Sequence, residues 1–293
     1  MNPFDLPGPQ FLLVYIVFSI FVNVCVVLLR RKFETFPTPR IDVSDPLLIA
    51  YLRGGHAEAM RVATVSLVDR GLLLCNGSYL TTASNAKPEA VRRPIEKQLL
   101  RKFATSGEAS SMFGDAALKA TLDEYEQKLS ELRLLPDGYI QRGRSLIFGC
   151  AFLLLGGASF LKIIIALERG RTNVGFLIVL TLISLVVVLV ASFPRLTQTG
   201  KNLLADLKEL YSDLKTRAPM IRPGGATLEP LMLASVYGVG ALSAGDGFTY
   251  TKSLFPKSQA SSGASCGSSC GSSCGSSCGG GGGCGGGCGG CGG

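Results

Sequence analysis

Three long apolar runs dominate the hydrophobic pattern of the chain. They cover residues 11–29 (FLLVYIVFSIFVNVCVVLL), 146–167 (LIFGCAFLLLGGASFLKIIIAL) and 174–193 (VGFLIVLTLISLVVVLVASF). At about 1.5 Å per residue, the first run forms a helix roughly 28 Å long, close to the thickness of a bilayer's hydrocarbon core. The pattern therefore predicts three transmembrane helices: an N-terminal signal anchor in residues 1–32 and a transmembrane hairpin in residues 146–194.

Basic residues flank these runs in a consistent way. An RRK sequence at 30–32 follows the first run directly, and RGR at 142–144 precedes the second. The positive-inside rule then places the N-terminus outside and residues 30–145 and 195–293 in the cytoplasm, at the inner (plasma) membrane, with membrane lipid as a partner. Lys162 interrupts the second run near its end. We expect its side chain to extend to the membrane surface rather than to form an intramembrane charge site.

A fourth apolar stretch, PLMLASVYGVGALSAG at residues 230–245, is shorter and contains several Gly and Ser residues. Basic residues lie on both sides of it, Arg217 and Arg222 before and Lys252 and Lys257 after. Because both flanks favour the cytoplasm, we expect an interfacial or re-entrant helix rather than a fourth span. If the stretch did span the membrane, the C-terminus would lie outside.

Between the first two spans, the pattern changes to that of a small cytoplasmic domain in residues 33–145. The DP sequence at 45–46 predicts the start of a short helix that ends at the GG of 54–55, and a second helix is expected over 56–70. Asn and Gly at 76–77, between two apolar runs, predict a β-hairpin because both residue types tolerate a positive φ. Helix, helix and hairpin in this order form a winged-helix-like unit.

A weaker copy of this pattern follows. A helical pattern covers residues 118–135, and LSELRLLPDGYI at 129–140 is similar to LVDRGLLLCNGSYL at 67–80. We therefore expect a second winged-helix-like unit, joined to the first by a helix around 94–103. Further cytoplasmic juxtamembrane helices are expected in residues 195–255.

Composition and charge narrow the range of partners. The mean hydropathy of +0.34 is typical of a membrane protein. The formal net charge of +8 is spread over several segments. In the predicted second helix, Arg61 and Arg70 are balanced by Glu58 and Asp69, whereas a helix that reads DNA needs a basic face. We therefore do not expect nucleic acid as a partner.

The chain offers few residues for catalysis. Its one histidine, His56, argues against a histidine-ligated metal centre and against a histidine pair for acid–base chemistry. Acidic pairs such as Asp123-Glu124 are expected on a solvated helix surface. With no catalytic constellation and no evident small-molecule substrate, we expect a non-enzymatic protein.

The last 38 residues, 256–293, differ in composition from the rest of the chain. They are mostly Gly, Ser and Cys, and they contain seven of the ten cysteines: Cys266, Cys270, Cys274, Cys278, Cys284, Cys288 and Cys291. Without large apolar side chains this tail cannot bury a core, so disorder is predicted. An odd number of cysteines in a reducing cytoplasm argues against a disulfide framework.

Several uses of the tail remain open. Thiolates are soft ligands for copper(I) or zinc, although the C-x-x-C spacing typical of zinc sites occurs only at 288–291. Cysteines with small neighbours, repeated along the chain, also suit an enzyme that modifies them one after another. A repeat produced by slippage is the third possibility, but slippage alone does not explain why cysteine persists while Ser gives way to Gly.

The layout resembles a bacterial family of functionally uncharacterised membrane proteins. The segments that carry the resemblance are residues 45–73, which begin DPLLIAYLRGG, residues 196–207 (LTQTGKNLLADL), and the Gly/Cys-rich end. Members of that family are similar in gene context to ribosomally made peptides that multinuclear non-haem iron oxidases alter. The resemblance implies that the tail is a modification substrate or a metal-handling segment, with a multinuclear iron-dependent enzyme as its partner. The serines in the first half of this tail depart from the family's pattern.

These observations predict a mainly α membrane protein with three transmembrane helices, a small winged-helix-like cytoplasmic domain with a β-hairpin, and a disordered Gly/Ser/Cys tail. The expected function is to present the tail for post-translational modification or soft-metal binding. The alternative is a membrane-tethered winged-helix regulator, or a protein-interaction scaffold, that senses redox or metal state.

Overall fold

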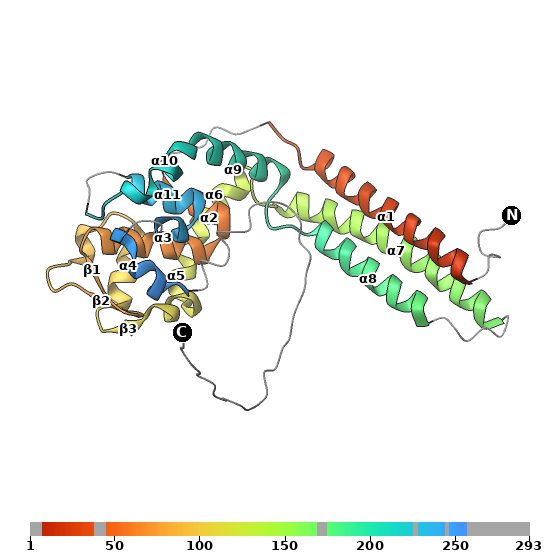
Figure 1. Cartoon of the computed structure of the whole chain (residues 1–293), viewed down its shortest axis with the longest axis horizontal. Helices are drawn as coiled ribbons and strands as arrows, with labels where there is room; N and C mark the ends of the chain where they lie inside the picture. The colour runs from red at the N-terminus through yellow and green to blue at the C-terminus, as the bar shows by residue number, and fades with distance from the viewer. Residues whose placement is uncertain (1–7, 38–44, 169–174, 225–227, 244–245, 257–293) are drawn as a thin grey trace, which may run out of the picture. The chain divides into compact units, whose positions relative to one another are not determined.

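The computed structural model describes residues 8–37, 45–168, 175–224, 228–243 and 246–256. These residues are mainly helical, and the strands among them form one three-stranded sheet. Three helices are long and apolar enough to cross a membrane: α1 (Gly8–Phe33), α7 (Gly138–Glu168) and α8 (Gly175–Ser192). They lie side by side (Figure 1). The three predicted spans are therefore confirmed as helices of membrane length and composition.

Small apolar side chains and a few hydroxyl groups join these three helices. One buried cluster takes residues from all of them: Val22, Val26, Ala151, Leu155 and Val188. The Oγ atoms of Ser19 on α1 and Ser184 on α8 are hydrogen-bonded at 2.8 Å. Interhelical packing of this kind, supported by hydroxyl groups, is typical of helices in lipid. The outward faces expose many Leu, Val, Ile and Phe side chains, as a lipid-facing surface requires.

Lys162 does not extend outward as expected. The residue is only 9% exposed, and its Nζ lies 4.5 Å from the centre of the Phe11 ring on α1. A cation over an aromatic face is stabilised by the ring's negative face. Lys162 therefore packs against α1 inside the bundle.

The remaining elements form a globular domain of short helices and the small sheet. The elements before α7 are α2 (Pro46–Gly54), α3 (His56–Asp69), β1 (Leu73–Asn76), β2 (Tyr79–Thr82), η2 (Pro88–Ala90), α4 (Pro94–Lys102), β3 (Gly107–Glu108), η3 (Ala109–Gly114), α5 (Ala116–Ala120) and α6 (Asp123–Glu131). Those after α8 are α9 (Gln198–Leu210), α10 (Ser212–Thr216), η4 (Ala218–Met220), α11 (Glu229–Tyr237), α12 (Val239–Leu242), η5 (Asp246–Phe248) and α13 (Tyr250–Leu254).

The first two helices of the domain form where the sequence predicts them. The carboxylate of Asp45 accepts a hydrogen bond from the amide of Leu47 at 3.1 Å, and Pro46 begins α2. This satisfies an amide that the helix itself leaves unpaired. Gly55, with a φ of 73°, ends α2 and precedes α3. A left-handed residue at this point favours glycine.

The hairpin after α3 is also present, but it turns one residue later than predicted. Asn76 pairs with Tyr79, so the turn consists of Gly77 and Ser78. Gly77 has a φ of 62°, which fits a two-residue turn with glycine at its first position. β3 then pairs with β2 and completes a sheet of order β1-β2-β3.

The second winged-helix-like unit, predicted for residues 118–140, is not found. This segment contains no strand, and its predicted single helix is divided into α5 and α6. Asp137, interpreted as a turn residue, instead caps α7 by accepting a hydrogen bond from the amide of Ile140 at 2.8 Å. The apolar run before it is held by Thr197, whose Oγ1 donates to the carbonyl oxygen of Arg133 at 2.8 Å. The sequence between the end of α6 and the start of α7 contains apolar and turn-forming residues in the same order as a helix followed by a hairpin. This similarity explains the wrong prediction.

The fourth apolar stretch lies in the core of the domain. Leu233 and Ala234 are fully buried in the same cluster as Leu47 and Leu67, and α11 packs against α2 and α3. A short apolar segment is the expected form of a buried core helix. The prediction of an interfacial or re-entrant helix is therefore wrong. The segments before and after the α7–α8 pair, predicted as separate regions, contribute to one core.

Candidate functional site

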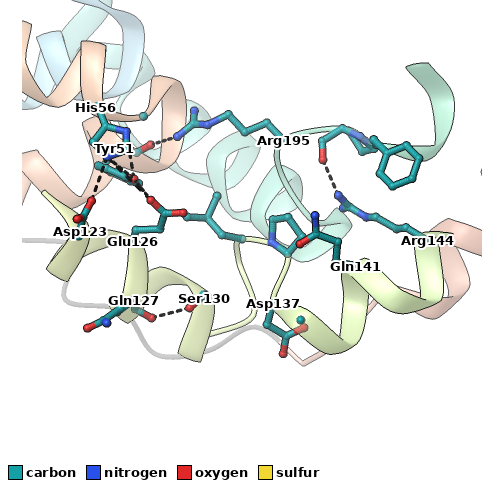
Figure 2. A pocket seen from close by; sticks show the side chains of 16 residues that line it. Tyr51, His56, Asp123, Glu126, Gln127, Ser130, Asp137, Gln141, Arg144 and Arg195 are labelled. Carbon is teal, nitrogen blue, oxygen red and sulfur yellow. Dashed lines mark hydrogen bonds and ion pairs between the residues drawn. The ribbon is translucent and has the colours of Figure 1, made fainter. Parts of the chain in front are cut away.

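A cavity of about 890 Å³ opens where four parts of the chain meet. They are the corner between α2 and α3, the start of α6, the start of α7, and the residues that follow α8 (Figure 2). Its lining combines aromatic, acidic, basic and imidazole side chains. A concave site with a few convergent polar groups is the usual form of a binding site.

The α2–α3 corner brings an arginine from the segment after α8 close to the backbone. Nη2 of Arg195 donates to the carbonyl oxygen of Tyr51 at 2.6 Å, and its guanidinium carbon lies 5.8 Å from the centre of the Tyr51 ring. A Cβ atom at Gly55 would lie 2.8 Å from Nη2, so glycine at this position permits the approach. Burial lowers the pKa of Arg195, while the nearby Tyr51 and Glu126 act in the opposite direction.

His56, the first residue of α3, faces two carboxylates in the first turn of α6. Its Nε2 lies 3.4 Å from Oδ1 of Asp123 and 3.9 Å from Oε2 of Glu126. Residues three apart on a helix share one face, so both carboxylates point toward the imidazole (Figure 2). One ligand atom from each of the three side chains lies within 4.8 Å of the others. This is a group of donors that can hold a metal ion.

Tyr51 links the two sides of this group. Its hydroxyl donates to Oε2 of Glu126 at 2.7 Å and lies 3.5 Å from Nδ1 and 3.4 Å from Nε2 of His56. Burial raises the pKa of Tyr51, and the hydrogen bond to Glu126 and the charge of that carboxylate raise it further. The phenol therefore stays protonated and serves as a hydrogen-bond donor.

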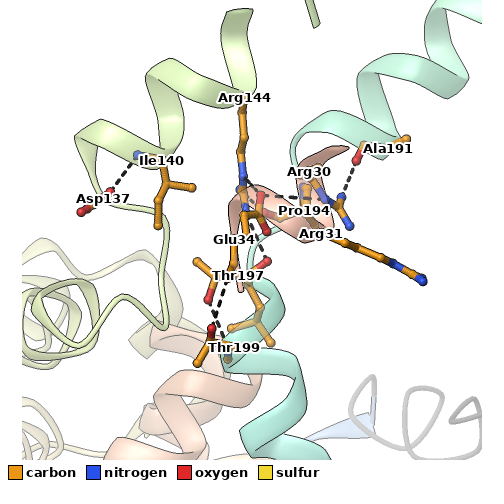
Figure 3. Close-up of polar contacts among 12 residues, drawn as sticks. Arg30, Arg31, Glu34, Asp137, Ile140, Arg144, Ala191, Pro194, Thr197 and Thr199 are labelled. Atoms are coloured by element: carbon orange, nitrogen blue, oxygen red, sulfur yellow. Dashed lines mark hydrogen bonds and ion pairs between the residues drawn. The ribbon is translucent and has the colours of Figure 1, made fainter. Parts of the chain in front are cut away.

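A buried ion pair between Arg144 and Glu34 lies next to the cavity, at the start of α7. Arg144 donates from Nε to Oε1 of Glu34 at 2.6 Å and from Nη1 to the carbonyl oxygen of Pro194 at 2.6 Å (Figure 3). The side chains of Arg144 and Glu34 are 3% and 1% exposed. Arg30 also contacts Glu34, at 3.8 Å, and donates to the carbonyl oxygen of Ala191. These contacts join the ends of α1 and α8 to the first turns of α7.

The predicted cysteine site falls outside the described residues. This is true of all seven residues proposed as metal ligands: Cys266, Cys270, Cys274, Cys278, Cys284, Cys288 and Cys291. Among the described residues, Cys25, Cys75 and Cys150 are free thiols on α1, β1 and α7. Burial raises the pKa of the Cys75 thiol, which lowers its reactivity at neutral pH. Copper(I) or zinc binding by the tail remains a prediction.

The sequence did not reveal the group around His56. A lone histidine argues against a histidine-ligated metal centre, and the sequence pattern predicts a solvated surface for Asp123. These residues are 67 positions apart, and only the packing of α2 against α6 brings them together. The sequence contains two local features that point to these residues. One is the histidine directly after Gly54-Gly55, and the other is the pair Asp123 and Glu126, which are three residues apart at the start of a helix.

Comparison of the chain with models of protein families, with curated proteins and with solved structures gave no match. The resemblance to the bacterial membrane-protein family therefore remains a prediction.

Proposed function

We propose that the protein is a non-enzymatic integral membrane protein that presents its cysteine-rich C-terminal segment for post-translational modification or soft-metal binding. The observation that carries the proposal is the burial of Phe255, which lies close to the cysteine segment in the sequence. Phe255 is 3% exposed and packs edge-to-face with Phe113, at 6.4 Å between ring centres. The Gly/Ser/Cys segment begins within a few residues of it. The residue that precedes this segment in the sequence is thus anchored in the core of the domain.

The chemistry of the segment supports the same conclusion. Seven thiols with Gly or Ser neighbours leave the backbone on both sides of each sulfur sterically open. Such sites suit copper(I) or zinc, for which thiolates are strong ligands, or a modifying enzyme that acts repeatedly on one chain. The resemblance described above favours a multinuclear iron-dependent enzyme in that role.

The orientation we propose places the domain and the segment in the cytoplasm, at the inner membrane. Contacts among Arg30, Glu34, Arg144 and Ala191 hold the C-terminal ends of α1 and α8 and the start of α7 together. The domain segments on either side of the spans then lie at one membrane surface. Basic residues gather at these helix ends, and such residues favour the cytoplasmic side.

The packing of α3 favours presentation over gene regulation. In a winged-helix regulator, a helix must present one face to the DNA groove. Most of α3 is buried in the domain, including Met60, Val62, Ala63, Val65 and Leu67. We therefore propose neither the winged-helix regulator nor a nucleic acid partner further. An interaction scaffold is compatible with presentation, since a modifying enzyme must dock on some surface of the domain.

Mass spectrometry of the C-terminal peptide, with metal analysis of the purified protein, tests this function. The peptide from cells that carry the modifying enzyme should show a mass shift, or the intact protein should contain copper or zinc. Replacing all seven tail cysteines with serine should abolish either signal, whereas Cys75→Ser should leave it unchanged. An unmodified mass together with no bound copper or zinc would refute the proposal.

An impermeant thiol reagent tests the orientation separately. In intact cells the tail cysteines and Cys75 should both be protected, and both should react after the membrane is opened and the protein unfolded. Labelling of the tail in intact cells would place it outside and contradict the proposed orientation.

A further inference from the structure

We propose that His56, Asp123 and Glu126 form a binding site for a divalent first-row transition-metal ion. The site uses one imidazole nitrogen and two carboxylate oxygens, and water fills the remaining coordination positions. It is separate from the cysteine segment, and its test does not depend on the proposed function.

The positions of the donor atoms fit one shared ion. Transition metals bind nitrogen and oxygen ligands at about 2.1 Å, so two ligands of the same ion lie about 3–4 Å apart. Nε2 of His56 is 3.4 Å from Oδ1 of Asp123 and 3.9 Å from Oε2 of Glu126. These two distances match that range, and all three ligand atoms lie within 4.8 Å of one another. The mixture of imidazole and carboxylate suits manganese(II), iron(II) or zinc rather than copper(I).

The two carboxylates of the group carry negative charge that a bound cation could balance. In the described part of the chain, the ion pairs of Asp123 and Glu126 are both made with His56. With a neutral imidazole, the two carboxylates carry two negative charges, which a divalent ion would balance. Arg195 acts on Glu126 through its charge only, without an ion pair among the described contacts, because its Nη2 donates to the carbonyl oxygen of Tyr51. By contrast, the neighbouring Glu124 is neutralised by Lys128 at 2.7 Å.

Tyr51 provides the support that metal-binding side chains usually have. A metal-bound histidine commonly donates its second ring N–H to an oxygen, which fixes the ring, and bound carboxylates are also hydrogen-bonded. The hydroxyl of Tyr51 donates to Oε2 of Glu126, and the same oxygen lies 3.5 Å from Nδ1 and 3.4 Å from Nε2 of His56. The phenol can therefore orient the carboxylate through a hydrogen bond and the imidazole through an edge-on ring contact, and burial on α2 holds it in place.

The site is open to solvent and joins two elements. The side chains of His56, Asp123 and Glu126 are 34%, 63% and 55% exposed, so an ion can enter directly from the cavity. Two ligands come from α6 and the third from the start of α3. A bound ion would cross-link these helices and stabilise the domain by mass action, since the unfolded chain does not hold the three ligands together.

Binding of manganese(II) to the full chain in nanodiscs of neutral lipid tests the proposal. Manganese(II) prefers nitrogen and oxygen ligands, so the tail thiols contribute little, and the loss of its free EPR signal counts bound ions. We expect one saturable site per chain. His56→Gln, Asp123→Asn and Glu126→Gln should each weaken binding at least about tenfold. Glu124→Gln removes a carboxylate from the same helical turn and should leave the affinity unchanged.

Thermal unfolding provides a second readout. Manganese(II) should raise the Tm of the wild-type chain and of Glu124→Gln, but not that of His56→Gln. If His56→Gln fails to fold, the two substitutions of exposed carboxylates decide the outcome. The absence of a saturable site in the wild-type chain would overturn the proposal. Equal loss of binding in Glu124→Gln and Glu126→Gln would do so as well, because it would indicate only a general effect of negative charge.

Discussion

The ion pair between Arg144 and Glu34 gives the sharpest prediction for stability. Arg144→Met retains a long side chain but removes every guanidinium contact. It leaves Glu34, whose side chain is 1% exposed, with Arg30 at 3.8 Å as its remaining ion-pair partner among the described residues. It also leaves the carbonyl oxygen of Pro194 without the hydrogen bond from Nη1. The substitution should therefore act on the junction of α1, α7 and α8.

The expected cost follows from burial. Removing one partner of a buried ion pair typically costs about 3–5 kcal/mol, because the other charge remains uncompensated. Arg30 stays near Glu34, so we expect a value near the lower end, about 3 kcal/mol. Glu34→Gln should also destabilise the protein when made alone. Combined with Arg144→Met, it should cost at least about 1 kcal/mol less than it does alone, since the two groups interact directly.

The assay is reversible unfolding of the purified protein in detergent, with all four members of the double-mutant cycle. Arg142→Met is the matched control, because Arg142 is an exposed arginine on the same helix. Its effect should stay within about 0.5 kcal/mol. If Arg144→Met and Arg142→Met have equal effects, or if the cycle shows no coupling, the buried pair does not stabilise this junction and the reasoning is wrong.

Three further substitutions test other parts of the structure by the same unfolding assay. Phe248→Ala should cost about 3–5 kcal/mol because the ring is fully buried, whereas Met220→Ala, at an 82% exposed side chain, should have little effect. Gly200→Ala should cost about 1–3 kcal/mol, since its Cβ would lie 2.5 Å from a backbone carbonyl oxygen, whereas Gly149→Ala has open space and should be tolerated. Asp115→Ala should cost about 1 kcal/mol at neutral pH through loss of a helix cap. The hydrogen bond from Lys102 lowers the pKa of Asp115 below its unfolded value of about 3.9, so this contribution is present above that pH and disappears as the pH falls through the folded pKa. A cost that persists in strong acid would contradict this assignment.

The sequence predicted the elements whose signals are local. An uninterrupted apolar run of membrane length is sufficient to indicate a spanning helix, and Asp45 and Gly55 mark the ends of α2 through the backbone conformations that they favour. The turn of the hairpin was predicted one residue too early, because Asn76 and Gly77 are both common turn residues. The pairing of Asn76 with Tyr79 places Asn76 in the strand and the turn at Gly77 and Ser78.

The predictions that failed depended on long-range packing. Apolar residues at 230–245 look the same whether lipid or protein covers them, and only the contacts with α2 and α3 identify a core helix. Similarly, nothing in the sequence near Lys162 indicates that its side chain contacts the ring of Phe11 on another helix. The group around His56 forms through packing between segments far apart in the chain, so neither spacing nor composition could reveal it.

The shared core has a consequence for how the protein is made. Residues 45–137 leave the ribosome first, yet the buried positions that they need in α11 and η5 are translated only after both helices of the transmembrane hairpin. The first half of the domain therefore stays incompletely packed while α7 and α8 are inserted into the membrane. The core closes only once translation has passed Phe255, so a nascent chain that stops earlier would lack buried side chains that the first half of the domain packs against.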